Sequence, residues 1–196
     1  MLPHIYLARH GETAWSLTGQ HTGRTDIPLT PKGEDNARAL AKRLHGLKFG
    51  RVYTSPLVRA KRTAELAGFP DAEIEPDLLE YDYGQYEGLR TAEIRQQRPD
   101  WDLFRDGCPG GETVEQVGAR ADRLFARLRT LPPGDVLLFA HGHILRVLAA
   151  RWLLLPPLEA RRFLLSTAAL SILAYEHNRL EEPALSLWND TRHMES

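Results

Sequence analysis

The chain has 196 residues and a mass of 22.2 kDa, which fits one domain of ordinary size. Its 25 basic and 26 acidic side chains nearly cancel, so the basic excess typical of nucleic-acid-binding proteins is absent. The single cysteine, Cys108, has no intramolecular disulfide partner, which favours a reducing compartment. The start lacks a leader pattern, and the most apolar stretch, residues 144–155, is too short and too charged to span a bilayer. We therefore expect a soluble, cytoplasmic protein with no nucleic-acid or membrane partner.

Three segments of the chain show a strand followed by a helix. In each, an apolar run precedes a stretch whose apolar residues recur every three to four positions. The third run is continuously apolar, which is typical of strands buried on both faces of a parallel sheet. The units are a strand at 5–8 with a helix from Thr30-Pro31 to Gly46, a strand at 52–54 with a helix at 57–67 opened by Ser55-Pro56, and a strand at 136–140 with a helix to about 154.

The remaining sequence adds elements around these units. Thr113 and Gln116 have the spacing of a capping box, which predicts the start of a helix. Residues 91–97 predict a short helix, and residues 170–175 and 184–188 predict two more strands.

This alternation of strands and helices indicates an α/β fold with a mainly parallel central sheet and helices on both of its faces. No shift in composition marks a second domain. We therefore predict a single domain over residues 1–196, in which residues 69–111 form a cap-like insertion over one end of the sheet.

Polar side chains follow the predicted strands at the points where these end. The first strand leads into Arg9 and His10, the second into Ser55 and Arg59, and the third into His141. Ligands of open α/β sheets bind outside the carboxyl ends of the strands. Guanidinium groups match phosphate oxygens, and helix N-termini at this edge add N–H donors. The sequence therefore predicts an anion site there.

The sequence lacks the motifs of other enzyme classes that act on phosphate groups. No G-x-x-x-x-G-K-[ST] loop is present, which excludes a P-loop NTPase. A cysteine phosphatase needs an arginine six positions after its cysteine, and Val114 stands at that distance from Cys108. His141 and His143 could suggest a metal pair, but no carboxylate or cysteine cluster lies near them in the sequence. We expect neither a metal nor a cofactor.

The segment LARHGETAW at 7–15 resembles the signature of the histidine phosphatase superfamily, also called the phosphoglycerate mutase-like family. The resemblance is similar in detail to the branch of fungal sedoheptulose-1,7-bisphosphatase and small actinobacterial acid phosphatases. It covers essentially the whole chain, through TGRTDIPLT at 22–30, TSPLVRA at 54–60, EYDYGQYEG at 80–88, RDGC at 105–108, GGET at 110–113, AHGH at 140–143 and EPAL at 182–185.

The resemblance implies roles for particular residues. His10 would be the nucleophile, and Glu80 would protonate the leaving alcohol and then activate water. Arg9, Arg59 and His141 would hold the phosphoryl oxygens. Further substrate contacts are implied for Ser16, which replaces the asparagine of many members, and for Thr22, Gly23, Arg24, Tyr83, Gly142, His143 and Arg146, of which Arg24 or Arg146 could hold a second phosphate.

The function predicted in this way is hydrolysis of small phosphorylated metabolites, with sugar bisphosphates among the candidates. A cofactor-dependent phosphoglycerate mutase is the main alternative, although such mutases carry a longer basic insertion after the acid-bearing loop. A non-catalytic phospholigand-binding protein and a metal-dependent esterase are further alternatives. The apolar residues at 153–155 and 164–165 form either core or a homo-oligomer face, and core is the favoured interpretation.

Overall fold

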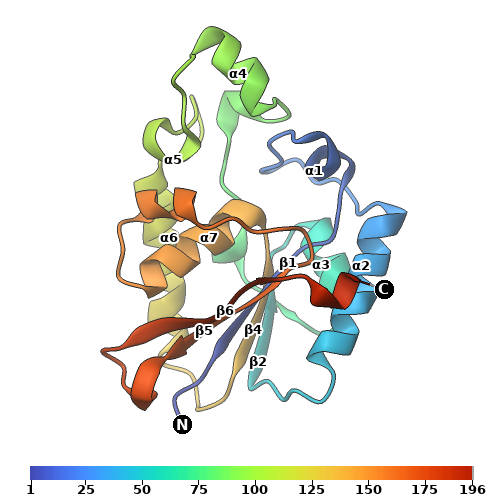
Figure 1. The fold of residues 1–196 in the computed structure, drawn as a ribbon, viewed down its shortest axis with the longest axis vertical. Helices are drawn as coiled ribbons and strands as arrows, with labels where there is room; N and C mark the ends of the chain where they lie inside the picture. The colour runs from blue at the N-terminus through green and yellow to red at the C-terminus, as the bar shows by residue number, and fades with distance from the viewer. Residues whose placement is uncertain (196) are drawn as a thin grey trace.

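The computed structural model describes residues 1–195 and confirms the α/β class (Figure 1). The sheet has the strand order β3-β2-β4-β1-β5-β6. Neighbours from β3 to β1 pair in parallel, whereas β5 pairs antiparallel with β1, and β6 with β5. The strands are β1 (Ile5–Arg9), β2 (Arg51–Thr54), β3 (Glu73–Ile74), β4 (Val136–Ala140), β5 (Leu170–Tyr175) and β6 (Pro183–Asp190).

The structure contains the helices predicted from the sequence and two further short helices, α1 (Ala14–Thr18) and α5 (Leu103–Asp106). Short 3-10 turns occur at η1 (Pro76–Leu78), η2 (Gly84–Tyr86) and η3 (Pro157–Arg162), and two more, η4 (Glu176–Asn178) and η5 (Arg192–Met194), lie near the end of the chain. The α-helices are α1 (Ala14–Thr18), α2 (Pro31–Leu44), α3 (Val58–Leu66), α4 (Thr91–Gln97), α5 (Leu103–Asp106), α6 (Val114–Leu128) and α7 (Gly142–Trp152).

Side-chain caps start two of the long helices where the sequence predicts them. The Thr30 hydroxyl accepts the N–H of Gly33 at 3.0 Å, and Thr113 forms the expected capping box with Gln116. The prediction that Ser55 caps the next helix is wrong. Helix α3 begins two residues later than that cap would place it, and the Ser55 hydroxyl contacts the His141 ring instead.

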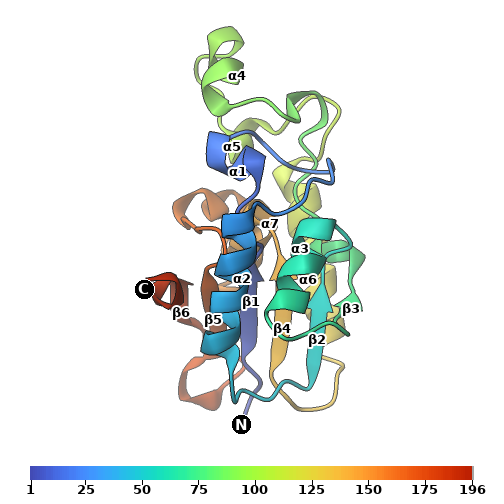
Figure 2. The same ribbon diagram turned by 90° about the vertical axis from the view of Figure 1, so that its right-hand side faces the viewer.

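Helices cover both faces of the sheet, as Figures 1 and 2 show. Successive side chains of a strand point to opposite faces, and β4 illustrates this. Leu137 and Phe139 pack in the core formed with α2 and α3, whereas Val136, Leu138 and Ala140 pack in the larger core formed with α6 and α7. Burial on both faces explains why β4 is continuously apolar in the sequence.

The segment predicted as a cap contributes partly to the sheet. Its residues Glu73 and Ile74 form β3, which pairs with β2, so the start of that segment belongs to the main body. Helices α4 and α5 then lie above the carboxyl ends of the strands, beside α1 (Figure 1). No helix within residues 1–195 is long and apolar enough to cross a membrane.

The apolar residues at 153–155 and 164–165 divide between core and surface. Leu165 is buried, and Leu153 and Leu155 pack against the larger core. Leu154 and Leu164 are 71% and 73% exposed, so the expectation of core is wrong for these two.

The central strand should dominate the stability of the fold. Leu138 is fully buried, so Leu138→Ala should lower the free energy of unfolding by about 2–5 kcal/mol through lost contacts and a residual cavity. Leu164→Ala removes the same atoms from an exposed site and should change it by less than ~0.5 kcal/mol. Urea unfolding of the two variants checks this, and equal losses would contradict the assignment of the core.

Candidate active site

A cavity of about 270 Å³ lies at the carboxyl ends of β1 and β4, where the sequence predicts an anion site. Residues from the loop after β1, the segment after η1 and the start of α7 meet there. The lining residues are Arg9, His10, Ser16, Gly19, Gln20, His21, Thr22, Glu80, Tyr83, Thr91, Gly142, His143, Arg146 and Leu165.

His10 is held as a neutral imidazole with one free nitrogen. Its Nδ1 lies 2.7 Å from the Gly11 carbonyl, which can only accept, so Nδ1 carries the proton. Burial and the nearby Arg9 and Arg59 keep the pKa of His10 well below its usual value. The unprotonated nitrogen is therefore Nε2, which is the atom that a nucleophilic histidine needs.

The loop that carries His10 is fixed by backbone contacts. The His10 N–H donates to the Ala140 carbonyl at 2.9 Å, and its own carbonyl accepts the Ala168 N–H at 2.9 Å. A side chain at Gly11 would place its Cβ 2.3 Å from the Gly33 carbonyl oxygen, so the loop and the start of α2 touch backbone to backbone. This contact explains the glycine that follows the nucleophile.

Arg59 and His141 lie behind the cavity wall, because both side chains are fully buried. The Arg59 Nε–H donates to His141 Nδ1 at 3.1 Å, so the neutral ring donates from Nε2 to the Ser55 hydroxyl at 2.7 Å. The other Arg59 donors reach the carbonyls of Thr22, Gly23 and Thr25 at 2.8–3.1 Å. Arg59 thus orients His141 and holds the 22–25 loop, and a direct phosphate contact by either residue stays a prediction.

His141 lies close to the nucleophile in spite of this burial. The ring centroids of His10 and His141 are 5.2 Å apart. Burial, together with Arg59, His10 and Arg9, lowers the pKa of His141 well below its usual value, so two neutral rings share this part of the site.

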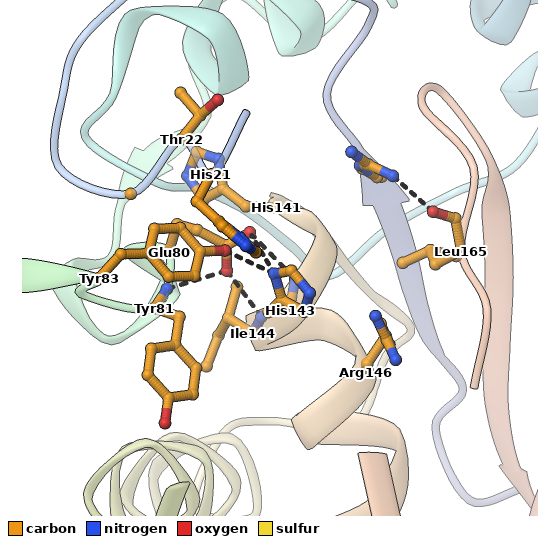
Figure 3. Close-up of polar contacts among 12 residues, drawn as sticks. His21, Thr22, Glu80, Tyr81, Tyr83, His141, His143, Ile144, Arg146 and Leu165 are labelled. Atoms are coloured by element: carbon orange, nitrogen blue, oxygen red, sulfur yellow. Dashed lines mark hydrogen bonds and ion pairs between the residues drawn. The ribbon is translucent and has the colours of Figure 1, made fainter. Parts of the chain in front are cut away.

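Glu80 is fixed at the N-terminus of α7, as Figure 3 shows. Its Oε1 accepts the backbone N–H groups of Tyr81 and Ile144, each at 2.9 Å, and its Oε2 accepts that of His143 at 3.0 Å. The residue is buried apart from the edge that lines the cavity. A carboxyl group with this support can exchange a proton with a molecule in the cavity without changing its position.

Arg9 and Arg146 supply the positive charge of the cavity wall. Arg9 donates to the Leu165 carbonyl, while its buried Nε has no hydrogen-bond partner among residues 1–195. Arg146 donates to the carbonyls of Ala160 and Arg161, and its guanidinium lies 4.8 Å from the centroid of the Phe104 ring. A buried donor without a partner is costly, so the Arg9 Nε is suited to an incoming anion.

A group of neutral rings forms the wall beside Glu80. The Tyr83 hydroxyl lies 2.5 Å from His143 Nδ1, and the Tyr83 and His21 ring centroids are 4.8 Å apart. Burial raises the pKa of Tyr83 and lowers those of both histidines, that of His21 to about 4. Sequence reasoning missed His21, whose only signal was its place directly before the TGRTD segment.

The other residues predicted to contact substrate fall into two groups, those that line the cavity and those that do not. Thr22, Tyr83, Gly142 and His143 line the cavity. Ser16 also lines it, but its hydroxyl donates to the Thr13 carbonyl at 3.0 Å and accepts the Thr13 N–H at 2.9 Å, within the capping box of α1.

Gly23 and Arg24 do not belong to the wall. Gly23 donates its N–H to the Glu87 carboxylate at 2.8 Å, and a Cβ at this position would lie 2.8 Å from the Tyr83 ring. The Arg24 guanidinium lies 3.6 Å from Asp82 and 3.8 Å from Glu112, and a substrate contact by Arg24 stays a prediction. Local sequence gives no sign of these partners, which come from the distant segment 82–112.

Comparisons with known proteins identify the family. Residues 5–191 match the sequence profile of the histidine phosphatase superfamily, branch 1. The chain belongs to this superfamily. It is 42% identical to an acid phosphatase of Mycobacterium tuberculosis, over 93% of this chain and 92% of that protein. It is also 32% identical to the sedoheptulose 1,7-bisphosphatase of Saccharomyces cerevisiae, over 95% and 93% of the two chains.

A solved structure of an open reading frame product of Mycobacterium tuberculosis has a TM-score of 0.90 and 41% identity, covering 95% of this chain and 97% of that one. Proteins named probable phosphoglycerate mutase, such as one from Salmonella choleraesuis, match at 32% identity over 89% of this chain and 86% of that protein. The histidine phosphatase fold and the phosphatases among the relatives identify the chain as a phosphatase enzyme, in a family whose chemistry passes through phosphohistidine.

The neutral histidines should make stability depend on pH. Burial lowers the pKa of His21 from 6.5 to about 4, so between these values the unfolded chain binds a proton that the folded chain does not. The free energy of unfolding therefore falls as the pH drops through this window, by up to ~1.4 kcal/mol per pH unit for one histidine. We expect His21→Asn to flatten the curve by about that slope.

Urea unfolding at a series of pH values, in a buffer free of phosphate, measures this slope. Above pH 6.5 the curves of the parent and of His21→Asn should run parallel, which serves as the internal control. Equal slopes below that pH would contradict the burial of a neutral His21.

Proposed function

We propose that this phosphatase hydrolyses monoesters of small phosphorylated metabolites through a phosphohistidine on His10. The observation that carries the proposal is a neutral His10 with a free Nε2 in the same cavity as the cation Arg9 and the carboxyl group of Glu80. Phosphoryl transfer depends mainly on positioning and on charge stabilisation, and this cavity supplies both. The relatives named as phosphatases support the same reaction.

In the first step, His10 Nε2 forms a bond to phosphorus while the bond from phosphorus to the ester oxygen breaks. Glu80, in its protonated form, gives its proton to that oxygen, and the alcohol leaves. Arg9 stabilises the charge on the other phosphoryl oxygens, with Arg59 and His141 close behind. A guanidinium group in this role can contribute ~10³–10⁵-fold.

In the second step, a water molecule attacks the phosphorus of phosphohistidine. Glu80 takes the proton of the water, the bond between phosphorus and Nε2 breaks, and inorganic phosphate leaves with His10 restored. A positioned acid and base of this kind contributes ~10²–10⁴-fold. The scheme uses protein groups alone, so we also propose that the activity needs no metal ion and persists in EDTA.

Hydrolysis is favoured over the mutase alternative by two features. The relative with 42% identity is named as a phosphatase, whereas those named as probable mutases match at lower identity. The segment between residues 88 and 109 is also short and has no adjacent pair of arginines.

A single buried, free cysteine, Cys108, supports a reducing compartment, and we propose that the protein acts in the cytoplasm.

Arg146 is the better placed of the two candidates for a second phosphate. It projects from α7, one turn beyond His143, and lines the cavity (Figure 3). Two of its nitrogens donate to the carbonyls of Ala160 and Arg161 in η3. Arg24 is engaged by Asp82 and Glu112 away from the wall. We propose a sugar bisphosphate as substrate, with the reacting phosphate at His10 and the other at Arg146.

Removal of the nucleophile tests the first proposal. His10→Ala should lower the turnover of p-nitrophenyl phosphate by more than about 10³-fold, because no other group can form the intermediate. Acid-labile, base-stable ³²P labelling of the parent protein, absent from His10→Ala, would identify phosphohistidine. Activity that survives in His10→Ala, or interconversion of phosphoglycerates without net phosphate release, would contradict the proposal.

The proposed contact between Arg146 and a second phosphate can be tested separately. Arg146→Ala should raise KM for a sugar bisphosphate by about tenfold or more, since a charge-assisted contact contributes ~1.5–3 kcal/mol, while KM for p-nitrophenyl phosphate changes little. Arg24→Ala should leave the preference for bisphosphate in place. Steady-state kinetics on both substrates decide, and a preference that survives Arg146→Ala would rule out this subsite.

A further inference from the structure

An ion pair between the buried Arg120 and the partly buried Glu112 lies outside the cavity and binds the backbone on both sides of Glu80. The Arg120 side chain, from the middle of α6, is 9% exposed. Its Nε and Nη2 donate to the two carboxylate oxygens of Glu112 at 2.7 and 2.8 Å, which is the bidentate geometry of a strong pair. Neither residue lines the cavity, so the pair takes no part in the chemistry described above.

Arg120 also binds the backbone that leads to Glu80. Its Nη1 donates to the carbonyls of Asp77 and Leu79 at 2.9 and 2.8 Å, and its Nη2 reaches the carbonyl of Glu80 itself at 3.4 Å. Residues 79–83 lie between two 3-10 turns and belong to no helix or strand. Buried carbonyls of such a segment need donors, and Arg120 supplies them.

Glu112 holds the other side of the segment. Its Oε2 accepts the Asp82 N–H at 3.0 Å, and its own N–H donates to the Asp82 carbonyl at 3.0 Å. The backbone is therefore tied before Glu80 by Arg120 and after it by Glu112, and the two ties are joined by the ion pair. The Glu80 carboxyl group itself is tied to the start of α7.

We infer that Arg120 and Glu112 are positioning residues for the proton transfer by Glu80. The inference rests on the proposed function, because it takes Glu80 as the group that protonates the leaving alcohol. The bonds to α7 fix the carboxyl group only if the main chain of Glu80 stays at the right distance, and the ion pair sets that distance. A misplacement of about 1 Å at a reacting group can cost ~10²-fold in rate.

The test compares two substrates that differ in their need for an acid. p-Nitrophenolate leaves from phosphorus without protonation, whereas the alkoxide of an alkyl phosphate needs the proton. Single-turnover rates of enzyme phosphorylation are measured for p-nitrophenyl phosphate and for an alkyl phosphate that the parent enzyme hydrolyses. Arg120→Gln should slow the alkyl phosphate by about tenfold or more beyond its effect on p-nitrophenyl phosphate, within the ~10²–10⁴-fold that an acid contributes.

Three further variants separate a positioning role from a general loss of structure. Glu112→Gln keeps the size of the side chain and should show the same selectivity to a smaller extent, with Arg120→Lys between Arg120→Gln and the parent. Arg123→Gln is the matched control, since Arg123 lies on the same helix, is exposed, and pairs with the side chain of Asp77 rather than with its backbone. It should leave the ratio of the two rates unchanged.

Glu80→Gln separates the two proposals. If Glu80→Gln does not slow the alkyl phosphate selectively, the assigned role of Glu80 fails. If it does, while folded Arg120→Gln and Glu112→Gln slow both substrates equally or not at all, the positioning inference alone is overturned. If Arg120→Gln does not fold, Glu112→Gln decides by the same ratio.

Discussion

The parallel pairing of β1 with β4 is the constraint on which the rest of the site depends. Its register places Arg9 opposite Ala140, and the His10 N–H donates to the Ala140 carbonyl at 2.9 Å. The residues that follow the two strands, His10 and His141, therefore emerge side by side with ring centroids 5.2 Å apart. Because β4 is buried between β1 and β2 and on both faces, this edge of the sheet has little freedom to move.

The guanidinium groups around these strands have two effects, one on the protonation of the histidines and one on an incoming anion. The guanidinium groups and the burial of the rings together keep His10 and His141 neutral, which a nucleophilic imidazole requires. In the proposed mechanism, the same guanidinium groups provide the field for a phosphate dianion. The chain as a whole is nearly uncharged, so the proposed mechanism draws its attraction for phosphate from charge focused in one cavity.

Arginine has three distinct roles in the molecule, which residue type alone does not separate. Arg9 and Arg146 line the cavity, whereas Arg59 is buried behind it and binds His141 and three loop carbonyls. Arg120 lies further away, in the ion pair that holds the Glu80 segment. The planar guanidinium has five donors, so a single buried arginine can satisfy several carbonyls of an irregular segment at once.

Local patterns in the sequence were enough to predict the fold class, the long elements and the residues at the strand ends. Apolar periodicity and the caps at Thr30 and Thr113 are local properties, and the topology of α/β sheets brings strand ends together. The role of Glu80 as the proton donor was predicted only from the family resemblance, because a carboxylate in an irregular segment has no local sequence signature.

Which of these residues face the cavity depends on how the chain packs in three dimensions. This packing placed Ser55 against His141, Arg24 against Asp82 and Glu112, and Arg120 beneath Glu80, all through contacts between segments far apart in the sequence. It also brought His21 into the wall beside Tyr83. Burial and hydrogen-bond partners are set by packing in three dimensions, so residue type and spacing could not assign them.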